Sequence, residues 1–346
     1  MDSVSFGSKC EFNRDLYKAA IKGDIQPFTD DNQHLDLILT PIKNTILHVH
    51  LSSETRKSIS FVREMLEKCP SLLLQVNANG DTPLHVAARH GYSTIVEVLI
   101  ECAKTQPQDT ESGLEYKQLM IRKSNNEGNS ALHEAVSSDY VRVVEILTKE
   151  DFEFSHFANN FGETPLFIAA ERGCLLSLRE ILEDASITRE LLKNKQCLTK
   201  NRNEHGWTPL HFAAYYRSFR ITKLLLEYDK SAAYAADKNR KMTPLHMAVS
   251  NASPLHICFM PKQFYVHMQI IEEIISQCPD CCQMVDDRGW NVLHFAMTKL
   301  PVRHLVTKKD AKGNTPLHVL AACRPREYPD IKKTHSKETD ILQPIF

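Results

Sequence analysis

Apolar residues recur along the chain in short blocks with the spacing of amphipathic helices. The block at Thr82–Gly91 is typical, and an i, i+3, i+4 apolar pattern follows it over Ile95–Ile100. Thr82 can cap a helix, and Pro83 fits the first helical position because the N–H that proline lacks would be unpaired there anyway. Gly91 allows a tight turn after the helix. Each block therefore predicts two short helices joined by a turn.

The same block returns along most of the chain. Strong copies of Thr-Pro-Leu-His begin at Thr82, Thr208, Thr243 and Thr315, and weaker copies begin at Thr45, Ser130, Thr164 and Asn291. The histidine can reach back to the capping hydroxyl, and an Asn/Asp–Gly turn links one block to the next. This pattern resembles the ankyrin repeat. The resemblance predicts an all-α repeat solenoid of about eight ankyrin units, each a hairpin, helix, turn and helix, stacked around one core.

Several units depart from regular spacing. Ser130 to Thr164 is 34 residues, close to the ~33 of an ankyrin unit, whereas Asn291 to Thr315 is only 24. We expect surplus residues to form a loop over 104–115 and an insert over 253–265 that splits a helix pair. Three turn glycines are replaced, by Asp139, Arg217 and Lys241.

The chain divides into three predicted segments. Residues 1–40 form an N-terminal capping segment, because residues 16–23 fit the first-helix pattern without a hairpin. Residues 41–325 form the repeat array, and residues 326–346 form a C-terminal tail.

Three stretches point to a particular family more sharply than the general repeat pattern does: residues 206–215, 224–238 and 274–296. They resemble the plant ankyrin-repeat membrane proteins of the accelerated-cell-death type, and the resemblance covers roughly residues 40 to 325. It implies a cytosolic array ahead of membrane-spanning helices, with roles in defence and cell-death control. We expect no such membrane block within this sequence, in which residues 326–346 follow the last predicted repeat. The expected location is therefore cytoplasmic, with any contact to the plasma membrane made through partners.

Composition argues against several classes of function. The 346 residues include 42 Lys and Arg against 43 Asp and Glu, which argues against binding nucleic acid through bulk charge. No apolar run reaches the ~18–20 residues of a membrane span, and the N-terminus lacks a secretory leader. Ten scattered cysteines fit reduced thiols in a cytoplasmic protein.

Side chains that could carry chemistry have structural explanations. Seven of the 16 histidines occupy the capping position, and successive copies would lie too far apart to share an ion at ~2.0–2.1 Å. The Cys278–Cys282 segment contains a CxxC motif without the second pair of a zinc site. No Gly-rich phosphate loop, HExxH or GxSxG is present. We predict no enzyme activity, no cofactor or metal, and no small-molecule substrate.

Binding residues are expected on the hairpin tips and first helices, which line the groove of a solenoid. Trp207 and Trp290 occupy the same hairpin position, and Tyr215 and Tyr216 lie on the helix beside Trp207. Exposed aromatic residues there suit a protein-binding hot spot. The alternative is that each tryptophan packs flat on the preceding hairpin, which we favour for Trp290. Four residues of the same face complete the candidate set as a rim: Arg89, His90, Glu171 and Arg172.

Three functional hypotheses follow from these patterns. In the first, the solenoid is a non-catalytic protein–protein interaction scaffold, placed by resemblance in plant defence, cell-death or stress signalling. In the second, it is a soluble regulatory paralogue that associates with membrane-anchored ankyrin relatives. In the third, the Cys278–Cys282 segment makes it a thiol- or metal-dependent sensor.

Overall fold

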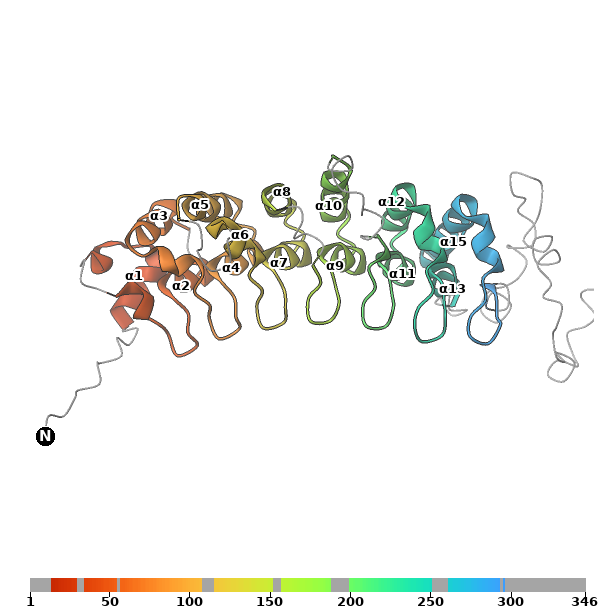
Figure 1. Cartoon of the computed structure of the whole chain (residues 1–346), viewed down its shortest axis with the longest axis horizontal. Helices are drawn as coiled ribbons and strands as arrows, with labels where there is room; N and C mark the ends of the chain where they lie inside the picture. Colours follow the sequence, from red (N-terminus) through yellow and green to blue (C-terminus); the bar gives the residue numbers. More distant parts are fainter. Residues whose placement is uncertain are drawn as a thin grey trace, which may run out of the picture.

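The computed structural model describes residues 14–29, 34–54, 57–107, 115–151, 157–187, 199–250, 261–292 and 295. These residues form an elongated row of paired helices with hairpins projecting along one edge (Figure 1). The regular elements of the described ranges are all helical, in agreement with the predicted all-α solenoid. The predicted repeat at Thr315, the tail at 326–346 and residues 253–260 of the insert lie outside the described residues.

The first helix of each repeat packs against the first helix of the next repeat, which builds one layer of the solenoid. A Thr or Ser cap begins each of these short helices, and a residue with left-handed backbone lies within two residues of the end of α4, α7, α9 and α11. This layer contains α2 (Ile46–Ser52), α4 (Pro83–Arg89), α7 (Ala131–Ser137), α9 (Pro165–Arg172), α11 (Pro209–Tyr215) and α13 (Pro244–Ser250). Helix α1 (Arg14–Lys22) packs on α2 and begins the layer.

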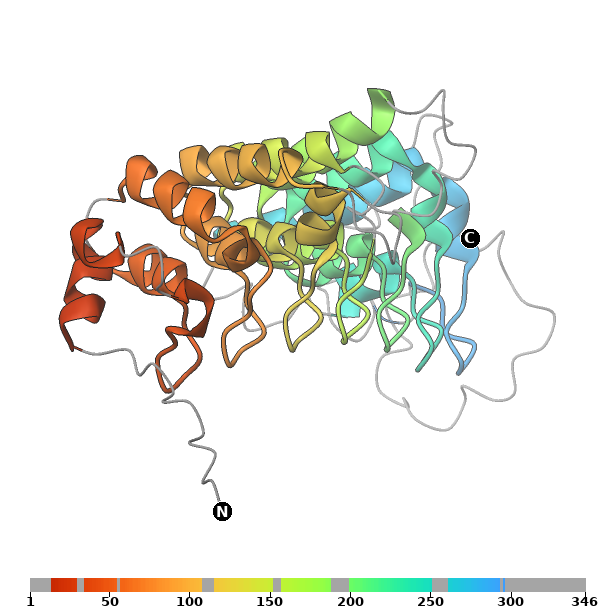
Figure 2. The ribbon, with the colours of Figure 1, turned by 60° about the vertical axis from the view of Figure 1, so that its left-hand side comes forward.

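The second helices form the other layer, and the side chains between the layers make one core. This layer contains α3 (Ile59–Lys68), α5 (Ser93–Lys104), α8 (Val141–Glu150), α10 (Leu175–Ile187), α12 (Phe219–Tyr228) and α15 (Pro261–Gln277). Figure 2 shows the two layers from a second side, with the hairpins extending from the first-helix layer. The leucine that follows the first residue of each first helix is buried: Leu47, Leu84, Leu132, Leu166, Leu210 and Leu245.

Short 3-10 helices connect the layers. Three of them follow a second helix directly: η3 (Pro70–Leu73), η7 (Lys230–Tyr234) and η8 (Pro279–Gln283). Two more, η1 (Gln26–Phe28) and η2 (Leu35–Leu37), lie between α1 and α2.

One expectation about the irregular spacings is wrong, and one helix was not predicted. The expected loop over residues 104–115 is followed by an unforeseen helix, α6 (Tyr116–Arg122), which packs on α5. Residues 261–265, assigned to the insert, are the start of α15, and α13 and α15 stay in contact. The insert therefore does not split this helix pair.

The residues that replace the turn glycines keep the backbone conformation of glycine. Asp139, Arg217 and Lys241 have φ values of 55°, 65° and 53°, and Lys43 at the first hairpin has 58°. A left-handed conformation costs a non-glycine residue on the order of 1 kcal/mol. For Asp139, a hydrogen bond of 2.7 Å from Ser177 Oγ offsets part of this cost.

Candidate protein-binding surface

The capping histidines join neighbouring repeats. Each Nδ1 lies 2.7–2.8 Å from the capping hydroxyl, and each Nε2 lies 2.7–3.1 Å from a backbone carbonyl in the next hairpin. A carbonyl can only accept, so Nε2 carries the proton and Nδ1 is the acceptor. Five described residues share this arrangement: His48, His85, His133, His211 and His246.

Both ring nitrogens of these histidines are occupied by hydrogen bonds, so the rings act as structural links. Burial lowers the pKa of His48, His133 and His211 to about 4, because a charged imidazole is poorly solvated there. Within the described ranges, no group of three or more His, Cys, Asp or Glu side chains is placed to hold a metal ion.

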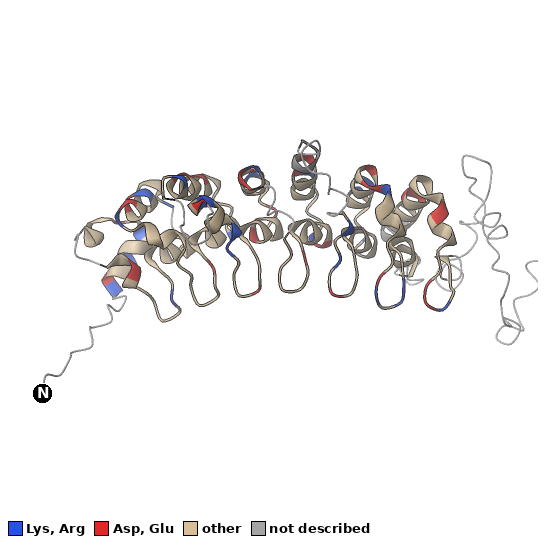
Figure 3. Ribbon diagram, in the orientation of Figure 1, with Lys and Arg blue, Asp and Glu red and all other residues tan. Residues whose placement is uncertain are grey.

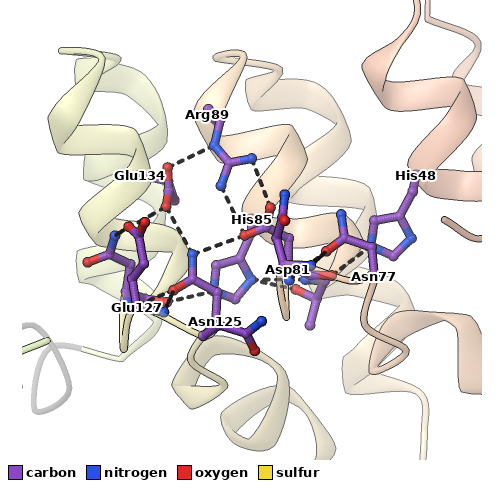
Figure 4. Close-up of polar contacts among 12 residues, drawn as sticks. His48, Asn77, Asp81, His85, Arg89, Asn125, Glu127 and Glu134 are labelled. Carbon is purple, nitrogen blue, oxygen red and sulfur yellow. Dashed lines mark hydrogen bonds and ion pairs between the residues drawn. The ribbon is translucent and has the colours of Figure 1, made fainter. Parts of the chain in front are cut away.

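Arg89 belongs to a polar network that crosses two repeats (Figure 4). Its guanidinium donates two hydrogen bonds of 2.9 Å to the buried carboxylate of Asp81 and one of 2.9 Å to Glu134. Asn125 also donates to both carboxylates, at 3.0 and 3.2 Å. Burial would raise the pKa of Asp81, but the bonds from Arg89 and Asn125 outweigh it and hold that pKa below its ordinary value. Arg89 therefore stabilises the stack of repeats.

The cysteines of the CxxC motif are buried in and before η8. The Cys278 thiol lies 3.3 Å from the Lys230 carbonyl, and burial raises its pKa. A thiol whose pKa is raised forms little of the reactive thiolate at neutral pH. The environment of Cys278 therefore does not favour the sensor hypothesis.

A surface hollow of about 550 Å³ lies between the repeats of α9 and α11. We call it the α9–α11 hollow. Its lining comes from the hairpins 159–164 and 203–208 and from the ends of α9 and α11. The aromatic lining residues are Phe161, Trp207, Phe212, Tyr215 and Tyr216, and the polar ones are Glu163, Glu171, Asn203, Glu204 and His205.

The aromatic rings of the hollow rest on one another and on the core. Trp207 contacts Phe212 and Tyr215 with ring centroids 4.8 and 5.3 Å apart, and Tyr215 contacts Tyr216 at 5.2 Å. Phe212 in turn packs 4.3 Å from the fully buried Phe167. Tyr216 is nevertheless 49% exposed. The rings are therefore held in fixed positions and still expose surface that a partner can cover.

The hollow carries negative charge. Glu163, Glu171 and Glu204 line it, and no lysine or arginine does. Burial, reinforced by the carboxylate of Glu163, raises the pKa of Glu171 above its ordinary value. The shift means that the charged form of Glu171 is only partly compensated, by Arg172, in the free protein.

The structure brings together half of the eight candidate residues. Four of them line the α9–α11 hollow: Trp207, Tyr215, Tyr216 and Glu171. Arg172 is adjacent in sequence to Glu171 and donates a 3.3 Å hydrogen bond to the Ser137 carbonyl.

The remaining candidates lie on other repeats. His90 stacks on Tyr92 with ring centroids 5.6 Å apart, beside the network of Arg89. The Arg288 guanidinium lies over the Trp290 ring at 4.2 Å, and Phe295 contacts that ring at 5.7 Å. Trp290 thus packs within its own hairpin and first helix.

Sequence reasoning missed the other six lining residues, among them Phe161, Glu163 and Glu204. Phe161 occupies a hairpin tip where other repeats carry polar residues, and this was the signal available in the sequence. The two glutamates gave no signal, because acidic residues are frequent at hairpin tips of this chain.

Comparison with known proteins identifies the repeat. The family model for ankyrin repeats matches three times, at residues 13–111, 113–190 and 183–260. The ankyrin repeat domain of Bcl-3 has a similar solved structure, with a TM-score of 0.53 and 19% identity over 68% of this chain and 93% of that chain. At this identity the likeness concerns the fold alone.

Curated relatives match over part of their length. Protein ACCELERATED CELL DEATH 6 from Arabidopsis thaliana is 23% identical over 64% of this chain and 33% of its own length. A transient receptor potential cation channel of subfamily A from Drosophila melanogaster is 24% identical over 69% of this chain and 19% of its own. The chain thus spans a third or less of these relatives. None of the helices within the described ranges is both long and apolar enough to cross a bilayer.

Proposed function

Because the chain belongs to the ankyrin-repeat family, we propose that it is a non-catalytic scaffold that binds a partner protein through the α9–α11 hollow. The observation that carries the proposal is the set of exposed rings held in place by the core, above all Tyr216 beside Trp207. Rigid aromatic side chains lose little conformational entropy on binding and are frequent among binding hot spots.

The similarity to an Arabidopsis cell-death protein supports a cytoplasmic role in plant defence, cell-death or stress signalling. It also makes ankyrin-containing membrane proteins candidate partners. Both points rest on 23% identity and on a third of that protein's length.

The test is the double substitution Trp207→Ala with Tyr216→Ala. We expect the immobilised variant to lose proteins that the wild type retains from plant extract, by at least about tenfold, because hot-spot truncation costs about 2 kcal/mol or more. The matched control is Leu176→Ala with Tyr234→Ala, two exposed apolar residues outside the hollow.

Thermal melting distinguishes binding from folding. The variant should melt within about 5 °C of the control, since both variants truncate partly exposed side chains. If both variants retain the same proteins, the hollow is not the binding site. If the Trp207 and Tyr216 variant unfolds at assay temperature, Tyr216→Ala alone decides, because Tyr216 is half exposed.

A further inference from the structure

The α9–α11 hollow combines two features that each attract cations. Its exposed rings present negative π faces, and Trp is the strongest aromatic partner for a cation. Its three carboxylates come from separate places in the sequence: Glu163 and Glu204 from adjacent hairpins, and Glu171 from the end of α9. The fold thus gathers like charges around aromatic rings.

The nearby cations do not neutralise this site. Glu204 lies 3.4 Å from the imidazole of His205, and no lysine or arginine lines the hollow. Arg172 follows Glu171 but does not line the hollow, and it only partly counteracts the effects of burial and Glu163 on Glu171. Elsewhere in the array the two signs are interspersed (Figure 3).

We propose, on the premise that the hollow is the partner-binding site, that it receives a lysine or arginine side chain from a basic segment of the partner protein. The cation lies against the Trp207 and Tyr216 rings and is neutralised by Glu163 and Glu171. Charge complementarity selects this occupant, because an acidic or phosphorylated segment would be repelled by three carboxylates.

The first experiment uses peptides of known charge. In a Trp290→Phe background, Trp207 is the only tryptophan and its fluorescence reports on the hollow. The probes are decalysine, decaarginine and decalysine with every side chain acetylated. We expect saturable changes in Trp207 emission with one or both cationic peptides and none with the acetylated peptide.

The second experiment uses matched variants of the protein. Glu163→Gln with Glu171→Gln should weaken binding of the cationic peptide by about fivefold or more, the effect of removing partly exposed ion pairs. The control, Glu183→Gln with Glu227→Gln, neutralises two exposed glutamates outside the hollow and should change affinity less than twofold. Tyr216→Leu should weaken binding by about threefold whereas Tyr216→Phe should not, since only leucine removes the π face.

Three outcomes would overturn the inference: no binding of either cationic peptide at millimolar concentration, equal binding of the acetylated peptide, or equal effects of the two glutamine pairs. Each leaves the proposed function standing if the Trp207 and Tyr216 variant still loses its partner. Retention of the partner by that variant contradicts the proposed function instead, whatever the peptides do.

Discussion

Lowering the pH should destabilise this protein at pH values well above the range in which its carboxylates become protonated. The buried His48, His133 and His211 have a pKa of about 4, against ~6.5 in the unfolded chain. The unfolded state therefore takes up protons first as the pH falls. Stability is complete above pH ~6.5 and decreases down to the folded pKa of about 4.

The magnitude follows from the linkage relation. One pKa unit corresponds to about 1.4 kcal/mol, and pH 5 lies about 1.5 units below the unfolded pKa. Each of the three histidines then costs about 2 kcal/mol, or about 6 kcal/mol together, a large part of the ~5–15 kcal/mol that typically stabilises a domain. Protonation of Nδ1 also breaks the acceptor bond to the capping hydroxyl.

The assay is urea unfolding followed by circular dichroism between pH 7 and pH 5. Replacing His133 by Phe, the residue that the chain itself uses at position 167, should reduce the pH-dependent loss by about 2 kcal/mol. His205→Gln, at a side chain that is exposed on the surface, is the control for replacing a histidine. A stability that is flat from pH 7 to 5, or equal slopes for wild type and His133→Phe, would refute the argument.

Further expectations concern the backbone and the array. Circular dichroism of the wild type should be predominantly helical, and a sheet-dominated spectrum would contradict the solenoid. Lys241→Gly should raise the free energy of unfolding by about 0.5–1 kcal/mol, because the exposed Lys241 holds a left-handed turn. Gly80→Ala should lower it in the same urea titration, since a Cβ would approach the Asn126 backbone N to 2.7 Å. Amide exchange should be slow over residues 77–180 and faster from residue 240, beyond the strained turns at Arg217 and Lys241; uniform protection would contradict this.

Most of the repeat architecture could be predicted because each position of the motif has a local physical role. The cap at Thr82, the reach of His85 to it and the turn at Gly91 all depend on residues within one repeat. The second bond of His85, to the Asn129 carbonyl, depends on a neighbour 44 residues away and was not foreseen. Helix α6 was missed for a related reason, because its burial depends on packing against α5.

The candidate site was predicted only in part. Trp207, Tyr215 and Tyr216 stand close together in sequence, so helix and hairpin geometry alone places them on one surface. Phe161 and Glu163 come from the preceding repeat and reach the same hollow only through stacking. Arg89 occupies the predicted face, but its surroundings engage it in ion pairs with Asp81 and Glu134, which no local pattern indicates.

The position of the hollow follows from one substitution in the motif. Phe167 stands where a histidine would bond to the next hairpin, so this junction lacks that link. Among the described residues, hairpins 159–164 and 203–208 also share no backbone hydrogen bond, whereas Asn160 bonds to Glu127 across the preceding junction. The contact of Phe167 with Phe212 replaces the missing links with aromatic packing that extends outward to Trp207. The same change that removes a polar connection therefore supplies the rigid support for the exposed rings.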